Sequence, residues 1–430
     1  MSLALDAIYG VVAVATAPWW MRKARGGWRE RFGHVESLPQ TPTGKKRLLL
    51  HTVSVGETNL VRPLVEMLTS PPHAATIDLV ISATTDTGLA RARELYATKA
   101  HVTRYPLDAS WSVRRFLDAV RPDAVALTEL ELWPNFATQC DHRGIPMSVI
   151  NGRLSERSFK RYRWIRWYLG GAFAQLRFAA AQDEAYCARF VAMGVPHDRC
   201  TVAGTMKWDA AHVGDTVPGA DQLAAEMGID RTRPLIVAGS TAPDEHELLH
   251  RACPDGVQLL CAPRRPEWFD AAAGALSTPN AGSPAAPPAA SCVRRSRPGI
   301  GDPARRRFVL DTIGELRMAY ALADVVVVGR SFGTLYGSDP MEPAALGKPV
   351  VIGPSVADFA ATVGAMKRDG AIIQTTRDAL AAELASLCVD APRRAELAER
   401  ARACVLAHQG ATRRHLDLLL KMLRENEPRA

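Results

Sequence analysis

The stretch LLLHTVSVGE, residues 48–57, decides the fold class, because an apolar run passes directly into a tight turn and the start of a helix. Residues 48–53 have the length and apolar character of a strand that is buried on both faces. Gly56 permits the turn, and Glu57 stands where the helix begins. Strands of this kind, alternating with helices, are typical of parallel sheets covered on both sides.

Similar apolar runs recur along the chain in two sets of about five, separated by a polar stretch, residues 211–233. The first set continues with residues 77–82, 123–127, 147–150 and 178–181, and the second comprises residues 235–238, 257–262, 307–310, 325–328 and 350–352. The sequence therefore predicts an α/β protein with two doubly wound, Rossmann-like domains. Ligands of such sheets bind beyond the carboxyl ends of the strands.

The pattern divides the chain into four parts. We expect a hydrophobic anchor and basic segment at residues 1–33, a first domain at 34–210, a second at 234–405 and a carboxyl-terminal helix at 406–430. Residues 274–291, within the second domain, are dense in Ala, Pro and Ser and are predicted to form a flexible surface insertion.

The amino-terminal residues 3–21 are apolar except for Asp6, and basic residues follow them directly. This order differs from that of a signal peptide, whose positive charge precedes the apolar stretch. We predict a membrane anchor that spans the bilayer or lies flat on it, with the folded body in the cytoplasm by the positive-inside rule. The alternative is a hydrophobic helix docked on the protein itself.

Charge is concentrated in three places. The 430-residue chain has 53 basic against 45 acidic side chains, a net charge of +8. Residues 22–31, 153–166 and 294–307 carry +4, +5 and +5, so the remainder is mildly acidic. We expect the first two clusters to face an anionic membrane and a phosphorylated substrate, and no nucleic acid partner. The eight cysteines are scattered, which favours a reducing compartment over a disulfide framework.

Carboxylates follow two strands of the first set. Glu57 is either a favourable charge at a helix amino terminus or a general base that faces the ligand. Glu129 and Glu131 come directly after the run 123–127, and they share one face if the chain is extended there. Charge at a sheet edge is paired or functional, and we expect at least one of the two to pair with an arginine.

The second set of strands ends in groups that suit a nucleotide with few phosphates. Gly239-Ser240-Thr241 and Pro263-Arg264-Arg265 offer amides, hydroxyls and guanidinium groups to a phosphate, while Asp339 and Glu342 could accept ribose hydroxyls. There is no Walker A motif and no D-x-D metal clamp. His246 to His250 matches H-E-x-x-H, but without further ligands we interpret these histidines as helix surface and predict no metal site.

The chain resembles the Kdo transferases, which move 3-deoxy-D-manno-oct-2-ulosonic acid (Kdo) from CMP-Kdo onto a lipid A precursor. The resemblance rests on motifs in the same order over some 330 residues. They are residues 28–33 (WRERFG), 51–57, 85–88 (TDTG), 129–135 (ELELWPN), 151–155 (NGRLS), 204–209, 239–241, 311–316 and 342–354.

This resemblance implies a two-domain GT-B glycosyltransferase whose domains face each other across a cleft, anchored at the cytoplasmic face of the inner membrane. It implies an inverting reaction without metal or other cofactor, with CMP-Kdo as donor and a lipid IVA-type lipid A precursor as acceptor. Glu57 becomes the general base and Glu129 a second essential carboxylate. The matching CMP positions are Pro263, Arg264, Asp339 and Glu342, and Ser240 and Lys207 lie at matching cleft positions.

Three motifs depart from the family pattern. Ser338-Asp339 stands where the family has His-Asn, Arg265 where it has a histidine after Pro-Arg, and Ala242 where it has a histidine after Gly-Ser-Thr. An added acid near a phosphate is unfavourable unless Arg265 or Arg330 offsets it. A different nucleotide sugar as donor and a catalytically weak homologue therefore stay open as alternatives.

Overall fold

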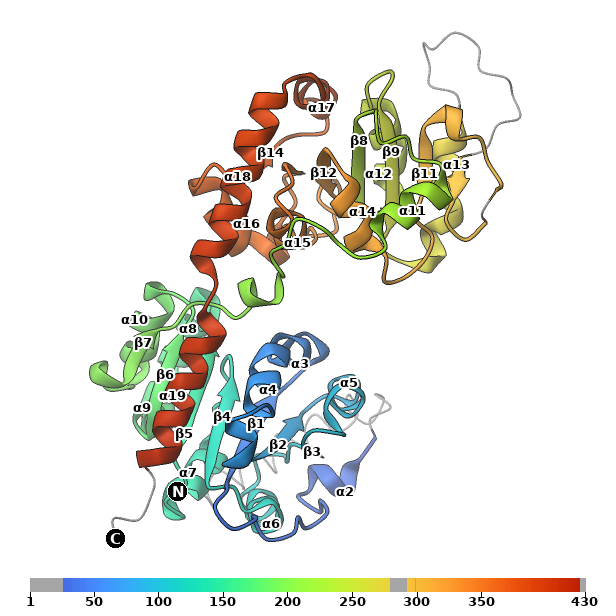
Figure 1. Cartoon of the computed structure of the whole chain (residues 1–430). Coiled ribbons are helices and arrows are strands. Elements are labelled where there is room, and N and C mark those ends of the chain that lie inside the picture. The colour runs from blue at the N-terminus through green and yellow to red at the C-terminus, as the bar shows by residue number, and fades with distance from the viewer. Residues whose placement is uncertain (1–25, 279–291, 298, 426–430) are drawn as a thin grey trace, which may run out of the picture. The chain divides into compact units, whose positions relative to one another are not determined.

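The computed structural model describes residues 26–278, 292–297 and 299–425 (Figure 1). The chain folds into two compact units. The first is formed by the chain up to Ala210 together with residues from Gln409 onward, and the second by Ala211–His408. Each unit is built around its own parallel sheet, as the alternation of apolar runs predicts.

The first unit contains a seven-stranded sheet in the order β3-β2-β1-β4-β5-β6-β7, parallel throughout. Its strands are β1 (Lys46–Thr52), β2 (Ile77–Ala83), β3 (His101–Arg104), β4 (Ala124–Thr128), β5 (Met147–Gly152), β6 (Leu176–Ala181) and β7 (Cys200–Val202). Its helices are α2 (Trp28–Arg31), α3 (Val55–Leu60), α4 (Arg62–Leu68), α5 (Asp86–Tyr96), α6 (Ser110–Val120), α7 (Pro134–His142), α8 (Glu156–Trp164), α9 (Arg166–Ala174), α10 (Glu184–Met193) and α19 (Ala411–Glu425).

Side chains alternate between the two faces of this sheet and form one core on each. Leu48 and Leu50 of β1 pack with α4 and α19, whereas Leu49 packs on the opposite face with Phe116 of α6. Figure 1 shows α19, coloured red, lying against the sheet of the first unit although it is last in sequence. Its buried leucines, Leu416, Leu419 and Leu423, explain why the chain returns here.

The second unit repeats this architecture in the order β10-β11-β9-β8-β12-β13-β14, again parallel. Its strands are β8 (Leu235–Thr241), β9 (Gln258–Pro263), β10 (Val293–Arg294), β11 (Arg307–Val309), β12 (Val325–Val328), β13 (Val350–Ile352) and β14 (Ile373–Gln374). Its helices are α11 (Ala220–Met227), α12 (Pro243–Ala252), α13 (Phe269–Ser277), α14 (Leu316–Leu322), α15 (Met341–Ala345), α16 (Ala360–Arg368), α17 (Leu380–Val389) and α18 (Ala391–His408).

Two expectations about the second unit are wrong in part. The predicted insertion at 274–291 begins too early, because the Ala-rich sequence continues helix α13 to Ser277 and Leu276 is fully buried. His246 and His250 are buried rather than on the helix surface. Both ring nitrogens of His250 have partners, the Thr278 carbonyl and the Arg307 guanidinium, so its burial is tolerated. Nε2 of His246 lies 3.0 Å from the Thr241 hydroxyl, whereas its Nδ1 is buried without a hydrogen-bond partner in the described part of the chain.

The predicted anchor, residues 3–21, lies outside the described residues and stays a prediction. Among the helices that the structure does describe, none combines the length and the apolar character needed to cross a membrane.

Candidate active site

The strand order places Glu57 and Glu129 at the switch point of the first sheet. β1 is followed by β2 on one side and has β4 on the other, so the connections that leave β1 and β4 diverge. A crevice forms where connections diverge in this way, and it is the usual ligand site of doubly wound sheets. Glu57 follows β1, and Glu129 follows β4, as the sequence predicts.

Glu57 lies in the first turn of α3 and its side chain folds back onto the end of the strand. Its Oε2 atom accepts a hydrogen bond from the backbone N–H of Val53 at 2.8 Å, and the Ser54 hydroxyl lies 3.5 Å from Oε1. Burial raises the pKa of Glu57 to about 7, the Val53 hydrogen bond opposes that rise, and the charges of Glu129 and Glu131 add to it. A carboxylate with this pKa can take up a proton near neutral pH.

Glu129 occupies a strained backbone position. Its φ of 61° lies in the left-handed region, which a residue with a side chain adopts at a cost of about 1–2 kcal/mol. The backbone is fixed there because the Glu129 N–H donates to the Ile150 carbonyl at 3.0 Å. Strain of this kind is concentrated at functional sites.

Glu131 adds a third carboxylate to the group. Burial raises its pKa, the indole N–H of Trp133 opposes the rise through a hydrogen bond of 3.0 Å to Oε2, and Glu129 adds to it. Arg153 interacts with this group in two ways. The negative charge of Glu129 stabilises its charged guanidinium, and its backbone N–H donates to the Glu129 carbonyl at 3.4 Å. The structure therefore brings Glu57, Glu129 and Glu131 into one electrostatically coupled cluster.

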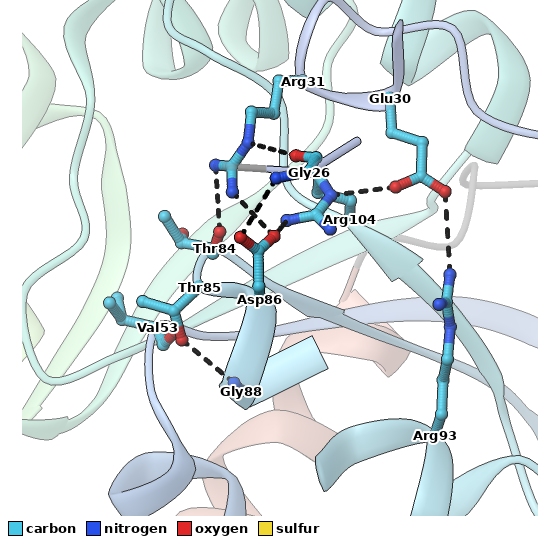
Figure 2. Close-up of polar contacts among 10 residues, drawn as sticks. All are labelled: Gly26, Glu30, Arg31, Val53, Thr84, Thr85, Asp86, Gly88, Arg93 and Arg104. Carbon is cyan, nitrogen blue, oxygen red and sulfur yellow. Dashed lines mark hydrogen bonds and ion pairs between the residues drawn. The ribbon is translucent and has the colours of Figure 1, made fainter. Parts of the chain in front are cut away.

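The turn that carries Glu57 is supported by the start of α5 (Figure 2). The Thr85 hydroxyl donates to the Val53 carbonyl at 2.9 Å and accepts from the Gly88 N–H at 3.0 Å. Gly88 is required because a Cβ atom there would lie 2.9 Å from the Val53 carbonyl oxygen. The TDTG motif thus acts as a support for the candidate base.

The same figure shows how α2 is attached to this support. Asp86 forms ion pairs with Arg31 at 3.0 Å and with Arg104 at 2.7 Å, and Arg104 also pairs with Glu30 at 2.8 Å. Arg31 is buried, so this member of the first basic cluster holds the structure together instead of facing a membrane.

In the second unit, β8 and β12 flank the corresponding switch point. Ser240, at the end of β8, has a φ of 57°, and Arg330, just after β12, has the same value. Next to Ser240, a Cβ atom on Gly239 would overlap the hydroxyl of Tyr320 in α14, so no side chain fits at this position. Strained residues therefore mark the carboxyl ends of these two central strands, as they do at Glu129.

Glu245 organises this edge of the second sheet, and sequence reasoning missed it. Its buried carboxylate accepts four backbone hydrogen bonds of 2.7–3.0 Å, from Ala242, Arg330, Ser331 and Phe332. Burial raises its pKa, and the four N–H groups oppose that rise. Because all four partners are donors, we infer that the carboxylate is ionised. An acid at the third position of a helix indicates a contact with the helix amino terminus, here with Ala242, but not the three contacts with residues 330–332.

The sequence-predicted nucleotide residues form two groups in this unit. Pro263 pairs with Thr241 across the sheet, and the Arg264 N–H donates to the Thr241 carbonyl at 3.0 Å, so both lie beside Ser240. Glu342 lies 3.8 Å from Arg317. Burial raises the pKa of Glu342, the charge of Arg317 opposes that rise, and the charge of Asp339 adds to it. Asp339 accepts a hydrogen bond from the Met341 N–H at 2.8 Å and so caps α15.

Lys207 belongs to the first unit, unlike the other predicted nucleotide residues. It follows β7, and its N–H lies 3.3 Å from the Thr205 hydroxyl. Within the second unit, the structure brings Ser240, Pro263 and Arg264 together and brings Asp339 near Glu342.

One set of side chains among the described residues has the composition of a metal site. Ligand atoms of Asp369, Cys404 and His408, all in the second unit, lie within 4.8 Å of one another. Burial and a hydrogen bond to Asp369 raise the pKa of Cys404 to about 12, and His408 Nδ1 lies 2.9 Å from the Cys404 carbonyl. Cys404 and His408 already interact with each other, and Asp369 interacts with Cys404.

Comparison with known proteins decides the family. A family model described as 3-Deoxy-D-manno-octulosonic-acid transferase (kdotransferase) matches residues 26–210. The 3-deoxy-D-manno-octulosonic acid transferase of Bordetella pertussis is 32% identical over 428 residues, which cover 93% of this chain and 94% of the relative. The chain belongs to the Kdo transferase family. The Haemophilus influenzae protein of the same description is 29% identical over 92% of this chain and 91% of its own.

Solved structures agree on the architecture of this Kdo transferase family member. The UDP-GlcNAc 2-epimerase of Neisseria meningitidis aligns with a TM-score of 0.56, covering 87% of this chain and 100% of that chain at 13% identity. At this identity the likeness shows the fold alone, with its two parallel sheets.

The arginines that could offset Asp339 in this Kdo transferase family member have other partners. Arg265 lies 3.8 Å from Glu267 and over the ring of Trp268, and Arg330 lies 3.9 Å from Asp358. The hydroxyl of Ser338, where the family has histidine, is buried without a hydrogen-bond partner in the described part of the chain. The departures therefore all lie in the second unit, whereas the Glu57 cluster belongs to the first.

Proposed function

We propose that this glycosyltransferase transfers Kdo from CMP-Kdo to a hydroxyl of a phosphorylated, lipid IVA-type lipid A precursor, with inversion and without a metal ion, in lipopolysaccharide biosynthesis. The observation that carries the proposal is Glu57, a carboxylate at the switch point of the first sheet with a pKa of about 7. The family relationship supports Kdo as the sugar.

In this proposal Glu57 takes the proton of the acceptor hydroxyl as its oxygen attacks the anomeric carbon of Kdo. The bond between that carbon and the phosphate oxygen of CMP breaks, and CMP leaves with the electron pair. Attack opposite the leaving group inverts the anomeric centre. Glu129 and Glu131 act on Glu57, because their negative charges keep its proton affinity high enough for this task.

The second unit is proposed to hold the single phosphate of CMP without a divalent cation. Arg264 is exposed at the end of β9, beside the strained turn at Ser240. A guanidinium group, hydroxyls and backbone N–H groups are sufficient to stabilise one departing phosphate. Glu342 and Asp339 are proposed to accept ribose hydroxyls, and Lys207 is proposed to contact the donor from the first unit.

The proposed location is the cytoplasmic face of the inner membrane, where a lipid acceptor is embedded. Its support is the apolar stretch at residues 3–21, followed by basic residues.

The test is an assay of purified full-length protein with CMP-Kdo and a lipid A precursor, with product mass as the readout. We expect CMP release and an acceptor that is heavier by one or more Kdo residues. Absence of CMP release with every Kdo donor and lipid acceptor would overturn the proposal.

A second candidate donor is favoured by the departures at Arg265, Ser338 and Asp339. Calorimetry with CMP, UDP and GDP separates the two. Preference for CMP supports CMP-Kdo as donor, whereas preference for UDP or GDP shows that a different nucleotide sugar is used.

A further inference from the structure

Arginines of the first and third basic clusters are held by acidic side chains of the protein, whereas the described basic residues of the second cluster are exposed. Arg31, from the first cluster, is buried against Asp86. In the third cluster, Arg294 pairs with Asp270 and Asp311, and Arg295 pairs with Glu226 and Glu315. These arginines form ion pairs within the folded chain. The second cluster, around α8, is different.

Helix α8 ends at Trp164 and α9 begins at Arg166, with the non-helical residue Ile165 between them, and we call residues 157–167 the α8–α9 elbow. Two indoles flank Ile165, with Trp164 84% exposed and Trp167 85% exposed. Ile165 itself is 44% exposed. Large apolar side chains gathered at such exposure mark a binding surface, since burying each of them in an apolar environment is favourable by about 1.5–3 kcal/mol.

Basic side chains surround the two indoles. The exposed members within the elbow are Arg157, Lys160, Arg161, Arg163 and Arg166. The nearby acid is Glu156, which pairs with Lys160 at 2.7 Å. A combination of indoles with a basic surround fits the headgroup region of an anionic bilayer, where indoles are enriched and each basic residue is attracted to acidic lipids.

The position of the elbow favours a lipid surface over a nucleic acid. Tyr162 lies in α8, and its pKa is raised by burial and further by the charge of Glu131. The N–H of Arg153, just before α8, lies 3.4 Å from the Glu129 carbonyl. The elbow therefore adjoins the carboxylates that are proposed to act on the acceptor, and that acceptor is a membrane lipid.

We propose that the α8–α9 elbow is a membrane-docking device, separate from the amino-terminal segment, that places Trp164 and Trp167 at the headgroup level of an anionic bilayer. It orients the carboxylate cluster toward a lipid acceptor. The choice of a lipid bilayer as the partner of the elbow rests on the proposed function, but docking to the bilayer does not itself require sugar transfer.

The first experiment measures quenching of tryptophan emission by lipids with brominated acyl chains. Full-length protein is mixed with vesicles of phosphatidylglycerol and phosphatidylcholine, or of phosphatidylcholine alone. We expect the variant Trp164→Phe/Trp167→Phe to lose about half of the quenched emission, with the remainder from Trp19 and Trp20 in the amino-terminal stretch. The control Trp111→Phe replaces a half-exposed indole on α6 and should keep the full quenching.

The second experiment tests the charge. The variant Arg161→Ala/Arg163→Ala should lose about fivefold in affinity for the anionic vesicles for each charge removed, with no change on neutral vesicles. The control Arg294→Ala removes an arginine that is paired within the second unit and should leave vesicle affinity unchanged.

The third experiment links docking to turnover. Trp164→Ala/Trp167→Ala should raise KM roughly tenfold for acceptor embedded in vesicles and leave kcat with detergent-dispersed acceptor unchanged. Equal quenching of wild type and the Trp164→Phe/Trp167→Phe variant would overturn the docking proposal, as would protection of the elbow by single-stranded RNA but not by vesicles. Elbow-dependent quenching without sugar transfer would instead uphold docking and contradict the proposed function.

Discussion

The Glu57 carboxylate accepts a hydrogen bond of 2.8 Å from the backbone N–H of Val53, so the candidate base is tied to the end of the strand before its own helix. This bond fixes one oxygen and leaves the other next to the Ser54 hydroxyl at 3.5 Å. The carboxylate is thereby oriented before substrate binds, which lowers the cost of reaching the reactive geometry.

Replacing Glu57 by glutamine should abolish proton acceptance while keeping the shape of the side chain. We expect kcat to fall by about 10²–10⁴-fold, the usual contribution of a general base, with CMP affinity unchanged. The measurement is CMP release at saturating donor and acceptor, with calorimetry for CMP. Glu66→Gln is the matched control, because Glu66 lies on α4 in an exposed pair with Arg62. Near-normal turnover of Glu57→Gln would remove Glu57 as the base.

The pH dependence of turnover should report the ionisation of Glu57. A general base acts in its ionised form, so kcat/KM should rise with pH and level off above about 7, the pKa of Glu57. Glu131→Gln removes one of the negative charges that raise this pKa, so the midpoint of the profile should move to lower pH. Glu94→Gln, an exposed acid on α5, should leave the midpoint in place. A midpoint that stays fixed in Glu131→Gln would show that the two carboxylates are not coupled.

The sequence predicts the ten inner strands of the two sheets but not the four edge strands, for a physical reason. Every one of the ten apolar runs overlaps a strand, since those strands are buried on both faces. The four strands that were missed, β3, β7, β10 and β14, all stand at sheet edges. They are two to four residues long and carry polar side chains such as Thr103 and Gln374, so neither length nor hydrophobicity marks them.

The sequence predicts the part of the site that follows from a doubly wound fold, in which residues just after the strands lie at the ligand-binding edge of the sheet. Glu57 and Glu129 could be found because each follows an apolar strand. Glu245 could not be recognised from its position alone, because three of its four donors come from residues 330–332, far away in sequence. The ion pairs of Arg294 and Arg295 are equally hidden from the sequence, since their partners lie on three separate segments, at residues 226, 270 and 311–315.

Glu245 should control nucleotide binding without taking part in the chemistry. Glu245→Gln presents an amide NH₂ to backbone N–H donors and leaves some of them unsatisfied, at a cost of about 1–3 kcal/mol for each buried group. We expect KM for the donor and Kd for CMP to rise about tenfold or more, with kcat little changed. Glu247→Gln is the matched control two residues along α12, where the side chain is 65% exposed. A variant with normal CMP affinity would limit Glu245 to a role in stability.

The last prediction concerns acid stability and begins with His51. This ring is fully buried, stacks on Tyr105 with 3.7 Å between centroids, and lies 3.0 Å from the Ser82 hydroxyl through Nδ1. Burial lowers the pKa of His51 from 6.5 to about 3, and a backbone hydrogen bond to Ser82 opposes the shift. The folded protein therefore keeps this histidine neutral over a range in which the unfolded chain binds a proton.

Between pH 6.5 and about 3 the unfolded state holds more protons, so the free energy of unfolding should decrease as pH falls. One such group contributes at most about 1.4 kcal/mol for each pH unit. His51→Gln removes the titrating group, and the pH dependence of Tm in its unit should become shallower although the variant is less stable at pH 7. His142→Gln, which replaces an exposed histidine on α7, should keep the wild-type slope. Parallel Tm curves for wild type and His51→Gln would show that acid unfolding starts at other groups.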